Sequence, residues 1–341
     1  MSDKAALAAP TGMDRFTDMA GGSWSSRPGF ASTLFEGNQV VTAIDSGYPS
    51  LRTRLSDEEG ANDREALVFM EGVRRRVDLG MRLLDTLAPN TGRDDAALVV
   101  GASRGEECLW IAHHGASRVV GTNLTDEPLT DDRILQGYAR AVNGRASIDD
   151  VLGRISLVVD DLASSSLPSG SFGRMYSWQT LEHVMSPREA LGEIFRLLRP
   201  GGAAFIEYNP FFSIDGAHWP ATIDLPWAHV LLSQEEFRRA VFTLHTDRPP
   251  DAAEFVERAI NRMTQAEVVR FAEAAGLRVA AALPRLRTED LMRVDERLLR
   301  VAQSRFPSCT IADLATRIMR LVLCKPDPPR CGATESGGAH S

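Results

Sequence analysis

The chain has 341 residues, 43% of them hydrophobic and 25% charged, and a formal net charge of -8 at pH 7. This length allows one sizeable α/β domain with an added lid, or two small domains, and we favour the first. The negative charge argues against a nucleic-acid partner, because phosphate binding requires clustered Lys and Arg. No stretch is long and apolar enough to cross a bilayer, so we expect no membrane partner.

The N-terminal part carries few structural signals. It begins MSDKAALAAPTGMDR, without the basic start and continuous apolar core of a signal peptide, which predicts a cytoplasmic location. Residues 1–60 are rich in Gly, Ser, Ala and Asp, and this composition predicts a partly ordered arm rather than a domain. The four cysteines lack the paired spacing of a zinc site or a disulfide framework.

Residues 61–326 have the pattern of one α/β domain. Apolar residues on one broad face predict a cap helix over 66–87. Strands and helices then alternate, which predicts strand-helix-strand units in a doubly wound, mostly parallel seven-stranded sheet. The first predicted elements are, in order, strand 96–100, helix 106–113, strand 118–122, helical residues 126–150, strand 155–159 and strand 175–178.

Residues 172–210 hold the strongest pattern in the chain, FGRMYSWQTLEHVMSPREALGEIFRLLRPGGAAFIEYNP. Apolar residues at positions 190–198 fall at helical spacing, and residues 203–208 form a short apolar run typical of a buried strand. Pro200 has no amide hydrogen and ends the helix, and the two glycines after it turn the chain. The segment therefore predicts another parallel strand-helix-strand unit.

The alternation is interrupted after this unit. Residues 210–260 contain prolines, aromatic residues and three histidines, and we predict a lid inserted over the strand ends. The remaining predicted elements are helix 261–275, strand 277–283, helical residues 288–318 and a last strand at 321–323. Residues 327–341 predict a disordered tail. The first and last apolar helical segments could pair with a second copy of the chain, so a homodimer is a further expectation.

The sequence of residues 172–210 resembles the pattern of one protein family. A Glu-His step, an amphipathic helix, a Pro-Gly-Gly turn and a strand reproduce the EH…hxxhhRhLxPGG pattern of class I S-adenosylmethionine-dependent methyltransferases. The resemblance covers residues 95–210 well and residues 260–326 by pattern alone. It implies a Rossmann-like methyltransferase fold, S-adenosyl-L-methionine as cofactor, and methyl transfer to a small molecule.

The loop after the first strand is the first candidate cofactor site. Gly101-Ala102-Ser103-Arg104-Gly105-Glu106 leads into a helix, and such a tight turn brings backbone amides and a helix N-terminus close to a ligand carboxylate. The resemblance implies that this loop holds the methionine half of the cofactor, through Gly101, Ala102, Ser103 and Gly105. The family pattern GxGxG has a glycine where this chain has Ser103.

The next two strand ends carry further candidates. Nucleotide-binding sheets place an acidic residue at the second strand end to bind ribose hydroxyls, and here that residue is Asn123, which could instead cap a turn. The resemblance implies that Asp161 binds the adenine amino group, although it could also be a helix cap. The aspartate that the family has after its phenylalanine is Gly173 in this chain. The other cofactor-binding residues that we expect are Leu162, Trp178 and Gln179.

The candidate catalytic residues are histidines. The cofactor's methyl group is already activated, so the protein must align the acceptor, exclude water and supply a base where the acceptor carries a proton. His218 and His229 lie in the lid sequence GAHWPATIDLPWAHV, either as the base or as structural histidines, and His183 of the Glu-His step is a third candidate. We predict no bound metal, with Asp215, His218 and His229 as the open alternative.

The predicted reaction is methylation of a small molecule at oxygen, with a lid histidine as base. Methylation of a natural product or metabolite at nitrogen or carbon remains open. So does a non-catalytic binding protein that kept the fold, because Ser103, Asn123 and Gly173 depart from the family pattern. A nicotinamide-dependent oxidoreductase explains the Glu-His and Pro-Gly-Gly steps less well.

Overall fold

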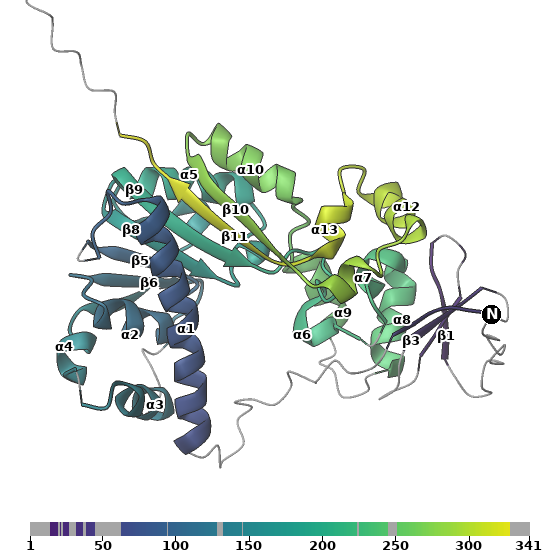
Figure 1. The fold of residues 1–341 in the computed structure, drawn as a ribbon, viewed down its shortest axis with the longest axis horizontal. Helices are drawn as coiled ribbons and strands as arrows, with labels where there is room; N and C mark the ends of the chain where they lie inside the picture. The colour runs from purple at the N-terminus through teal and green to yellow at the C-terminus, as the bar shows by residue number, and fades with distance from the viewer. Residues whose placement is uncertain are drawn as a thin grey trace, which may run out of the picture.

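The structure is a computed structural model, and it describes residues 14–19, 21, 23–26, 32–36, 39–44, 63–93, 95–127, 132–144, 146–223, 225–244 and 251–327. Nearly all of the predicted C-terminal tail lies outside these residues. Figure 1 shows two lobes, one built on a large sheet crossed by the long helix α1 (Asp63–Leu87), and a second of short helices next to a small sheet.

The large sheet confirms the predicted doubly wound, mostly parallel seven-stranded architecture. Its strands are, in spatial order, β10 (Arg278–Leu286), β11 (Thr316–Cys324), β9 (Leu198–Tyr208), β8 (Phe172–Trp178), β5 (Ala97–Val100), β6 (Val119–Asn123) and β7 (Ile155–Val159). The five strands from β9 to β7 pair in parallel, whereas β11 is antiparallel to both of its neighbours. The chain goes from β5 to β6 and β7 on one side and then returns to β8 on the other side of β5, so the topological switch point lies between β5 and β8.

Helices cover both faces of the large sheet. One face packs against α1, α2 (Glu106–His113), α3 (Asp132–Val142) and α4 (Ile148–Leu152), and the other against α5 (Pro187–Leu197) and α10 (Gln265–Ala274). The side chains of β5 alternate between the two faces, because Ala97 and Val99 lie in the first cluster while Leu98 and Val100 lie in the second. No helix in the described part of the chain is both long and apolar enough to cross a bilayer.

The second lobe has a hydrophobic core of its own. Its helices are α6 (His218–Ala221), α7 (Ala228–Leu231), α8 (Gln234–Leu244), α9 (Ala252–Arg258), α11 (Thr288–Leu291), α12 (Glu296–Arg305) and α13 (Ile311–Ala315). Trp227 and Leu231 from the predicted lid pack there with Leu298 and Leu314 from the later segment. The lid is therefore completed by residues 288–315. The helical segment predicted over 288–318 extends too far, because β11 already begins at Thr316.

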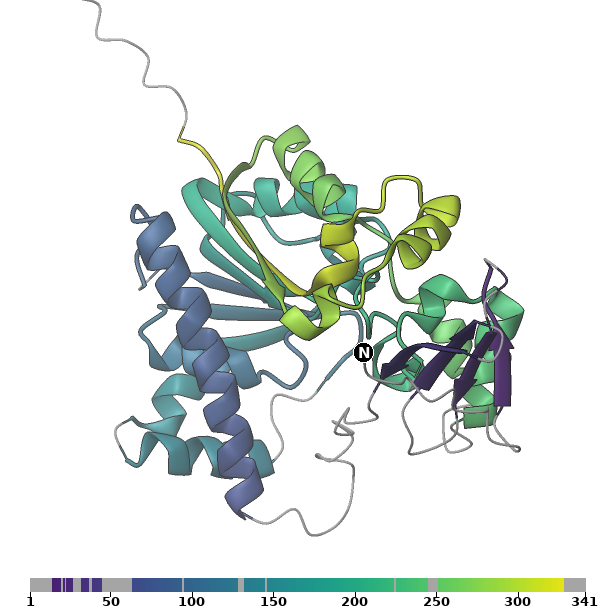
Figure 2. The ribbon, with the colours of Figure 1, turned by 45° about the vertical axis from the view of Figure 1, so that its right-hand side comes forward.

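Residues 14–44 form strands that the sequence did not predict. β1 (Asp14–Thr17), β2 (Ser23–Ser26), β3 (Ser32–Glu36) and β4 (Gln39–Ile44) make an antiparallel meander in chain order. Figure 2 shows this sheet beside the helices of the second lobe. Phe16 is fully buried in that lobe's core, and the Asp18 carboxylate lies 3.1 Å from the Arg297 guanidinium. β1 is thus part of the second lobe.

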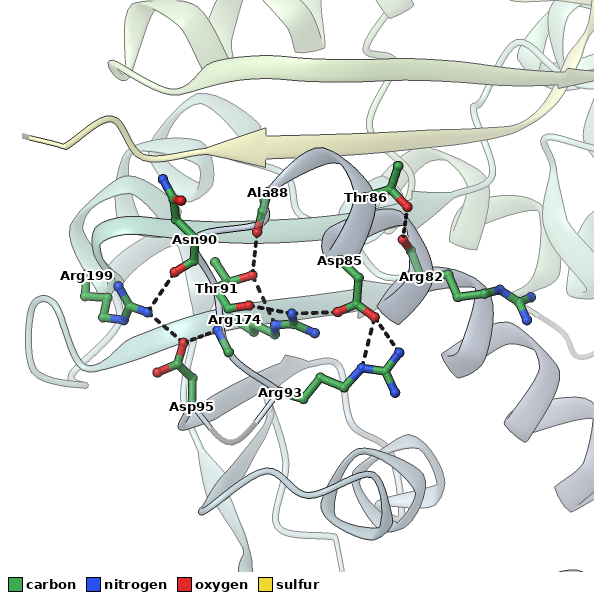
Figure 3. Close-up of polar contacts among 11 residues, drawn as sticks. Arg82, Asp85, Thr86, Ala88, Asn90, Thr91, Arg93, Asp95, Arg174 and Arg199 are labelled. Carbon is green, nitrogen blue, oxygen red and sulfur yellow. Dashed lines mark hydrogen bonds and ion pairs between the residues drawn. The ribbon is translucent and has the colours of Figure 1, made fainter.

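An arginine network lies at the N-terminal ends of the parallel strands of the large sheet (Figure 3). The buried Arg174 at the start of β8 donates to Asp85 Oδ1 at 2.7 Å and to the Thr91 carbonyl at 2.8 Å. Burial alone would raise the pKa of Asp85, but hydrogen bonds from Arg93 and Arg174 outweigh it and lower that pKa. The network ties the C-terminal end of α1 to the sheet.

A second ion pair at these strand ends explains why position 173 is a glycine. Asp95 accepts a hydrogen bond from the Arg199 guanidinium at 2.7 Å. A Cβ at Gly173 would lie 2.4 Å from the Asp95 carboxylate (Figure 3 shows Asp95 beside Arg199). The Asp95 carboxylate therefore occupies the space that a side chain at position 173 would need, at the N-terminal end of β8.

Candidate active site

The candidate site lies where the parallel strands of the large sheet end. Gly101 follows β5, Asn123 ends β6, Gln179 follows β8 and Asn209 follows β9. Open α/β sheets bind ligands at the carboxyl ends of their strands, beside the topological switch point. The segments predicted to bind the cofactor are therefore brought to one edge of the sheet.

The loop after β5 has a backbone that few residues can adopt. Gly101, Ser103 and Gly105 have positive φ angles of 70°, 47° and 86°. The amides of Gly101 and Ala102 both donate to the Thr122 carbonyl, at 2.9 and 3.0 Å. A Cβ on Gly101 would lie 2.0 Å from Thr180 Oγ1, so the loop fits closely against the segment that follows β8.

Asn123 braces this loop. Its Oδ1 accepts a hydrogen bond from the Ser103 amide at 2.8 Å, and its Nδ2 donates to the Ser103 carbonyl at 2.7 Å. Ser103 is the residue that stands in place of the family glycine, and Asn123 holds both of its backbone polar groups. This bracing is a role that the sequence did not reveal. Ribose binding through the remaining lone pair of Oδ1 stays a prediction.

Asp161 is a cap in this structure. Its Oδ1 accepts a hydrogen bond from the Ala163 amide at 2.9 Å, at the start of the 3₁₀ helix η1 (Leu162–Ser164). Its side chain is exposed, so adenine binding stays a prediction. The neighbouring Asp160 accepts a hydrogen bond from the Ser166 amide at 2.8 Å and thereby fixes the loop that follows.

The last three expected cofactor residues differ in exposure. Leu162 and Trp178 are 7% and 5% exposed and pack in the cores on opposite faces of the sheet. The Trp178 ring stacks on Tyr176 with ring centroids 5.6 Å apart. Gln179 is exposed and has a positive φ of 50°, and its amide donates to the Glu207 carbonyl. Of the three, Gln179 alone presents an exposed side chain at the strand ends.

The structure brings together two of the three candidate histidines. The rings of His183, in the 3₁₀ helix η2 (Leu181–His183), and His218, at the start of α6, lie 4.9 Å apart between centroids. His229 is 5% exposed, and its Nε2 donates to the Phe211 carbonyl at 2.6 Å in the core of the second lobe. Burial lowers the pKa of His229 to about 4. Burial lowers the pKa of His218 to about 4 as well, so the hydrogen bond to Phe211, and not the pKa, favours a structural role for His229; its role as base stays a prediction.

Glu182 belongs to the Glu-His step, but it is not one of the candidate catalytic residues predicted from the sequence. It is 1% exposed; its Oε1 accepts a hydrogen bond from the Asn209 amide at 3.1 Å, and its Oε2 is buried without a hydrogen-bond partner in the described structure. Burial raises the pKa of Glu182 to about 8, so the carboxyl group is mostly protonated at neutral pH. The Glu-His step was the available signal.

Hydrogen bonds to backbone carbonyls hold η2 in place. The Asn261 side chain donates to the Leu181 and Val184 carbonyls at 2.7 and 2.9 Å. His183 Nδ1 donates to the Ala259 carbonyl at 2.7 Å, which leaves its Nε2 with a free lone pair. His218 Nε2 is likewise buried without a partner in the described structure. Glu182, His183 and His218 thus form a polar cluster beside the end of β9, which we call the Glu-His-His cluster.

The residues of the alternative metal site do not come together. Asp215 Oδ1 accepts a hydrogen bond from Ser213 Oγ at 3.0 Å, and its Oδ2 lies 3.7 Å from the Arg317 guanidinium. The His229 imidazole donates to a backbone carbonyl in the core of the second lobe. His218 is the one member of that set that lies in the Glu-His-His cluster.

The part of the chain that forms the large sheet is similar to known proteins. Residues 98–206, from β5 to β9, match a family described as a methyltransferase domain. A 24-methylenesterol C-methyltransferase 2 from Oryza sativa subsp. japonica is 31% identical over 182 residues, which are 53% of this chain and 44% of that protein. A sterol 24-C-methyltransferase from Eremothecium gossypii is 31% identical over 110 residues, 32% of this chain and 26% of that protein. The chain thus spans less than half the length of these relatives.

Solved structures with a similar fold include a geranyl diphosphate methyltransferase in complex with S-adenosylmethionine. Its TM-score is 0.45 and its identity 14%, over 79% of this chain and 92% of that chain. The matched residues 98–206 contain the loop after β5, Asn123, Asp161 and the Glu-His step. On this match, together with the strand order, residues 98–206 form a methyltransferase domain with the class I, Rossmann-like fold.

Proposed function

We propose that the protein transfers a methyl group to a small molecule that binds between the strand ends of the large sheet and the second lobe. S-adenosylmethionine supplies a methyl group already activated on its sulfonium. The residues present fit this cofactor, because Gly101 leaves no room for a side chain and the braced loop presents backbone amides next to the N-terminus of α2. Asn123 and Asp161 would bind the ribose and the adenine amino group.

The Glu-His-His cluster is the observation that supports an acceptor site. The buried Glu182 Oε2 and His218 Nε2 have no hydrogen-bond partner in the described structure, and such groups cost about 1–3 kcal/mol each. A polar group of the acceptor that bound there would remove this cost. The acceptor would then be oriented at the end of β9, on the edge of the sheet that carries the cofactor residues.

Oxygen is the acceptor atom that we propose, because lone pairs on two imidazoles suit an acceptor hydroxyl that must lose a proton. Carbon is the second candidate, because both curated relatives are named as C-methyltransferases. Transfer from cofactor with a ¹³C-labelled methyl group separates the two, since the carbon chemical shift of the product differs between a methyl on oxygen and one on carbon.

Variants of the cluster test the proposed function. Glu182→Gln and His218→Asn should reduce methyl transfer to a panel of hydroxylated small molecules by roughly 100-fold, the lower range for loss of proton-transfer groups. Their affinity for S-adenosylhomocysteine should stay within about twofold of the parent. His113→Gln, which removes a half-buried histidine on α2, is the matched control and should keep full activity. Unchanged turnover in both cluster variants would remove the cluster from the reaction.

A further inference from the structure

We propose that Glu182, His183 and His218 bind a Zn²⁺ ion. One ligand atom of each residue lies within 4.8 Å of those of the other two, in the only such group of three His, Cys, Asp or Glu side chains among the described residues. Two imidazole nitrogens and one carboxylate oxygen are a common ligand set of catalytic zinc. The inference rests on the proposed function, because it assigns the acceptor side of the same site to a metal.

The unpaired atoms of the cluster are an independent sign of a ligand. Glu182 is 1% exposed, and its Oε2 has no hydrogen-bond partner in the described structure; the same is true of His218 Nε2. The Glu182 carboxyl group would give up its proton when a cation binds, and its oxygen and the His218 nitrogen would then both be electron-pair donors. One cation between them satisfies both, whereas a hydrophobic group satisfies neither.

The other polar atom of each ligand is already held by backbone. Asn209 donates its amide to Glu182 Oε1 at 3.1 Å, and His183 Nδ1 donates to the Ala259 carbonyl at 2.7 Å. His218 forms a hydrogen bond with the backbone of Asn209. Metal-binding histidines and carboxylates are oriented by such outer contacts, and here the contacts leave Oε2 of the glutamate and Nε2 of both imidazoles available.

His218 also adopts a backbone conformation that is uncommon for residues other than glycine. Its φ angle is 59°, in the left-handed region that most side chains avoid. Its amide donates to the Asp215 carbonyl at 2.9 Å, which fixes the turn that carries the imidazole toward His183. Strained residues concentrate at binding sites, where the surrounding structure holds a side chain in place.

Three protein ligands leave a coordination position open, as in catalytic zinc sites. An acceptor hydroxyl at that position would lose its proton to solvent near neutral pH. Its oxygen would then form a bond to the methyl carbon as the bond between that carbon and sulfur breaks, which releases S-adenosylhomocysteine. The ion would therefore both orient the acceptor and activate it.

Cobalt titration of the untagged, chelator-treated full chain tests the inference, with Zn²⁺ competition as the second step. We expect one Co²⁺ per chain, with visible absorption bands that Zn²⁺ abolishes. Glu182→Gln keeps an acceptor for the Asn209 amide, and His218→Asn tolerates a positive φ, so both variants should fold. Each should weaken Co²⁺ binding by at least about 100-fold, because losing an outer contact alone costs 10- to 100-fold. His113→Gln should bind Co²⁺ like the parent.

Two outcomes would overturn the inference. Either no Co²⁺ binds, or it binds equally well to the parent and to both cluster variants. Methyl transfer that continued unchanged after chelation would contradict the role in acceptor activation. Calorimetry with S-adenosylhomocysteine on the same metal-free samples keeps the two proposals separate, because cofactor binding does not require the ion. A chain that binds the cofactor product but no metal retains the proposed function without this inference.

Discussion

Gly101 shows how one residue can constrain the loop after β5. Gly101→Ala would combine a positive φ of 70° with a Cβ that lies 2.0 Å from Thr180 Oγ1. Gly144→Ala isolates the first effect, because Gly144 has a φ of 71° and a Cβ there would meet no described atom within 4 Å. We expect the control to lose about 1–2 kcal/mol of unfolding free energy. Gly101→Ala should lose more and should also bind S-adenosylhomocysteine more than about tenfold less tightly.

Urea unfolding and calorimetry of the two variants provide the comparison. Equal stability and equal affinity in both would show that the contact between Gly101 and Thr180 does not constrain the loop.

A substitution of Asn123 distinguishes its two possible roles, which are to brace the loop and to bind the ribose. Asn123→Asp supplies the acidic residue that ribose binding favours, but it removes the donor to the Ser103 carbonyl and places a carboxylate beside it. If bracing is the main role, the variant should bind S-adenosylhomocysteine about tenfold less tightly, which is about 1.4 kcal/mol. Tighter binding by Asn123→Asp in calorimetry would instead make ribose contact the main role.

The sequence predicted where the candidate site residues lie in the sheet better than it predicted their contacts. The Gly-rich loop, Asn123 and Asp161 follow strands whose order was readable, so their shared edge of the sheet was predictable. The hydrogen bonds from Asn123 to Ser103 join residues 20 positions apart and depend on the loop backbone. His229 was a candidate because aromatic residues surround it in sequence, yet its imidazole is buried against the Phe211 carbonyl, a contact that no spacing reveals.

At the scale of elements, the strand-helix alternation was readable because each parallel strand is a short apolar run between amphipathic helices. α2 and β7 have the predicted boundaries. The strands β1 to β4 were missed because their segment is rich in Gly and Ser, which weaken the periodic signal. The N-terminal part of β11 was assigned to a helix, since Ile318 and Leu321 also fit helical spacing.

The network at the start of β8 predicts a pH dependence of stability. The native pKa of Asp85 is lowered, so the interaction contributes its full stability above the unfolded pKa of about 3.9 and loses it as the pH falls through the native value. Asp85→Asn should therefore reduce the free energy of unfolding at pH 7 by roughly 1–3 kcal/mol. The difference from the parent should shrink below about pH 4.

Urea unfolding from pH 7 to pH 3 measures this difference, with Asp149→Asn, a change of an exposed aspartate on α4, as control. A difference that stayed constant across the whole pH range would contradict the contribution of the Asp85 charge.

At the scale of the molecule, the second lobe depends on the N-terminal segment. Phe16 is fully buried in the core of that lobe, and the Arg239 guanidinium lies 4.5 Å from the centre of its ring. Phe16→Ala should destabilise the lobe by about 3–5 kcal/mol, because it leaves a cavity among large side chains. The core clusters of the sheet lobe do not contain Phe16, so binding of S-adenosylhomocysteine should persist.

Limited proteolysis should show faster cleavage within residues 211–244 of Phe16→Ala than of Val68→Ala, which removes an exposed methyl pair on α1. Equal cleavage rates in the two variants would mean that the N-terminal strand does not support the lid.

We propose that the strand ends of the large sheet bind S-adenosylmethionine, and the rest of the proposed function depends on this binding. Calorimetric titration of the full chain with S-adenosylhomocysteine, alongside Gly101→Ala, tests it most directly. We expect micromolar binding of one molecule per chain by the parent and a clear loss of affinity in the variant, because we propose that the braced loop contacts the amino-acid half of the ligand. Absence of binding by the parent, or equal binding by the variant, would contradict the assignment of this site.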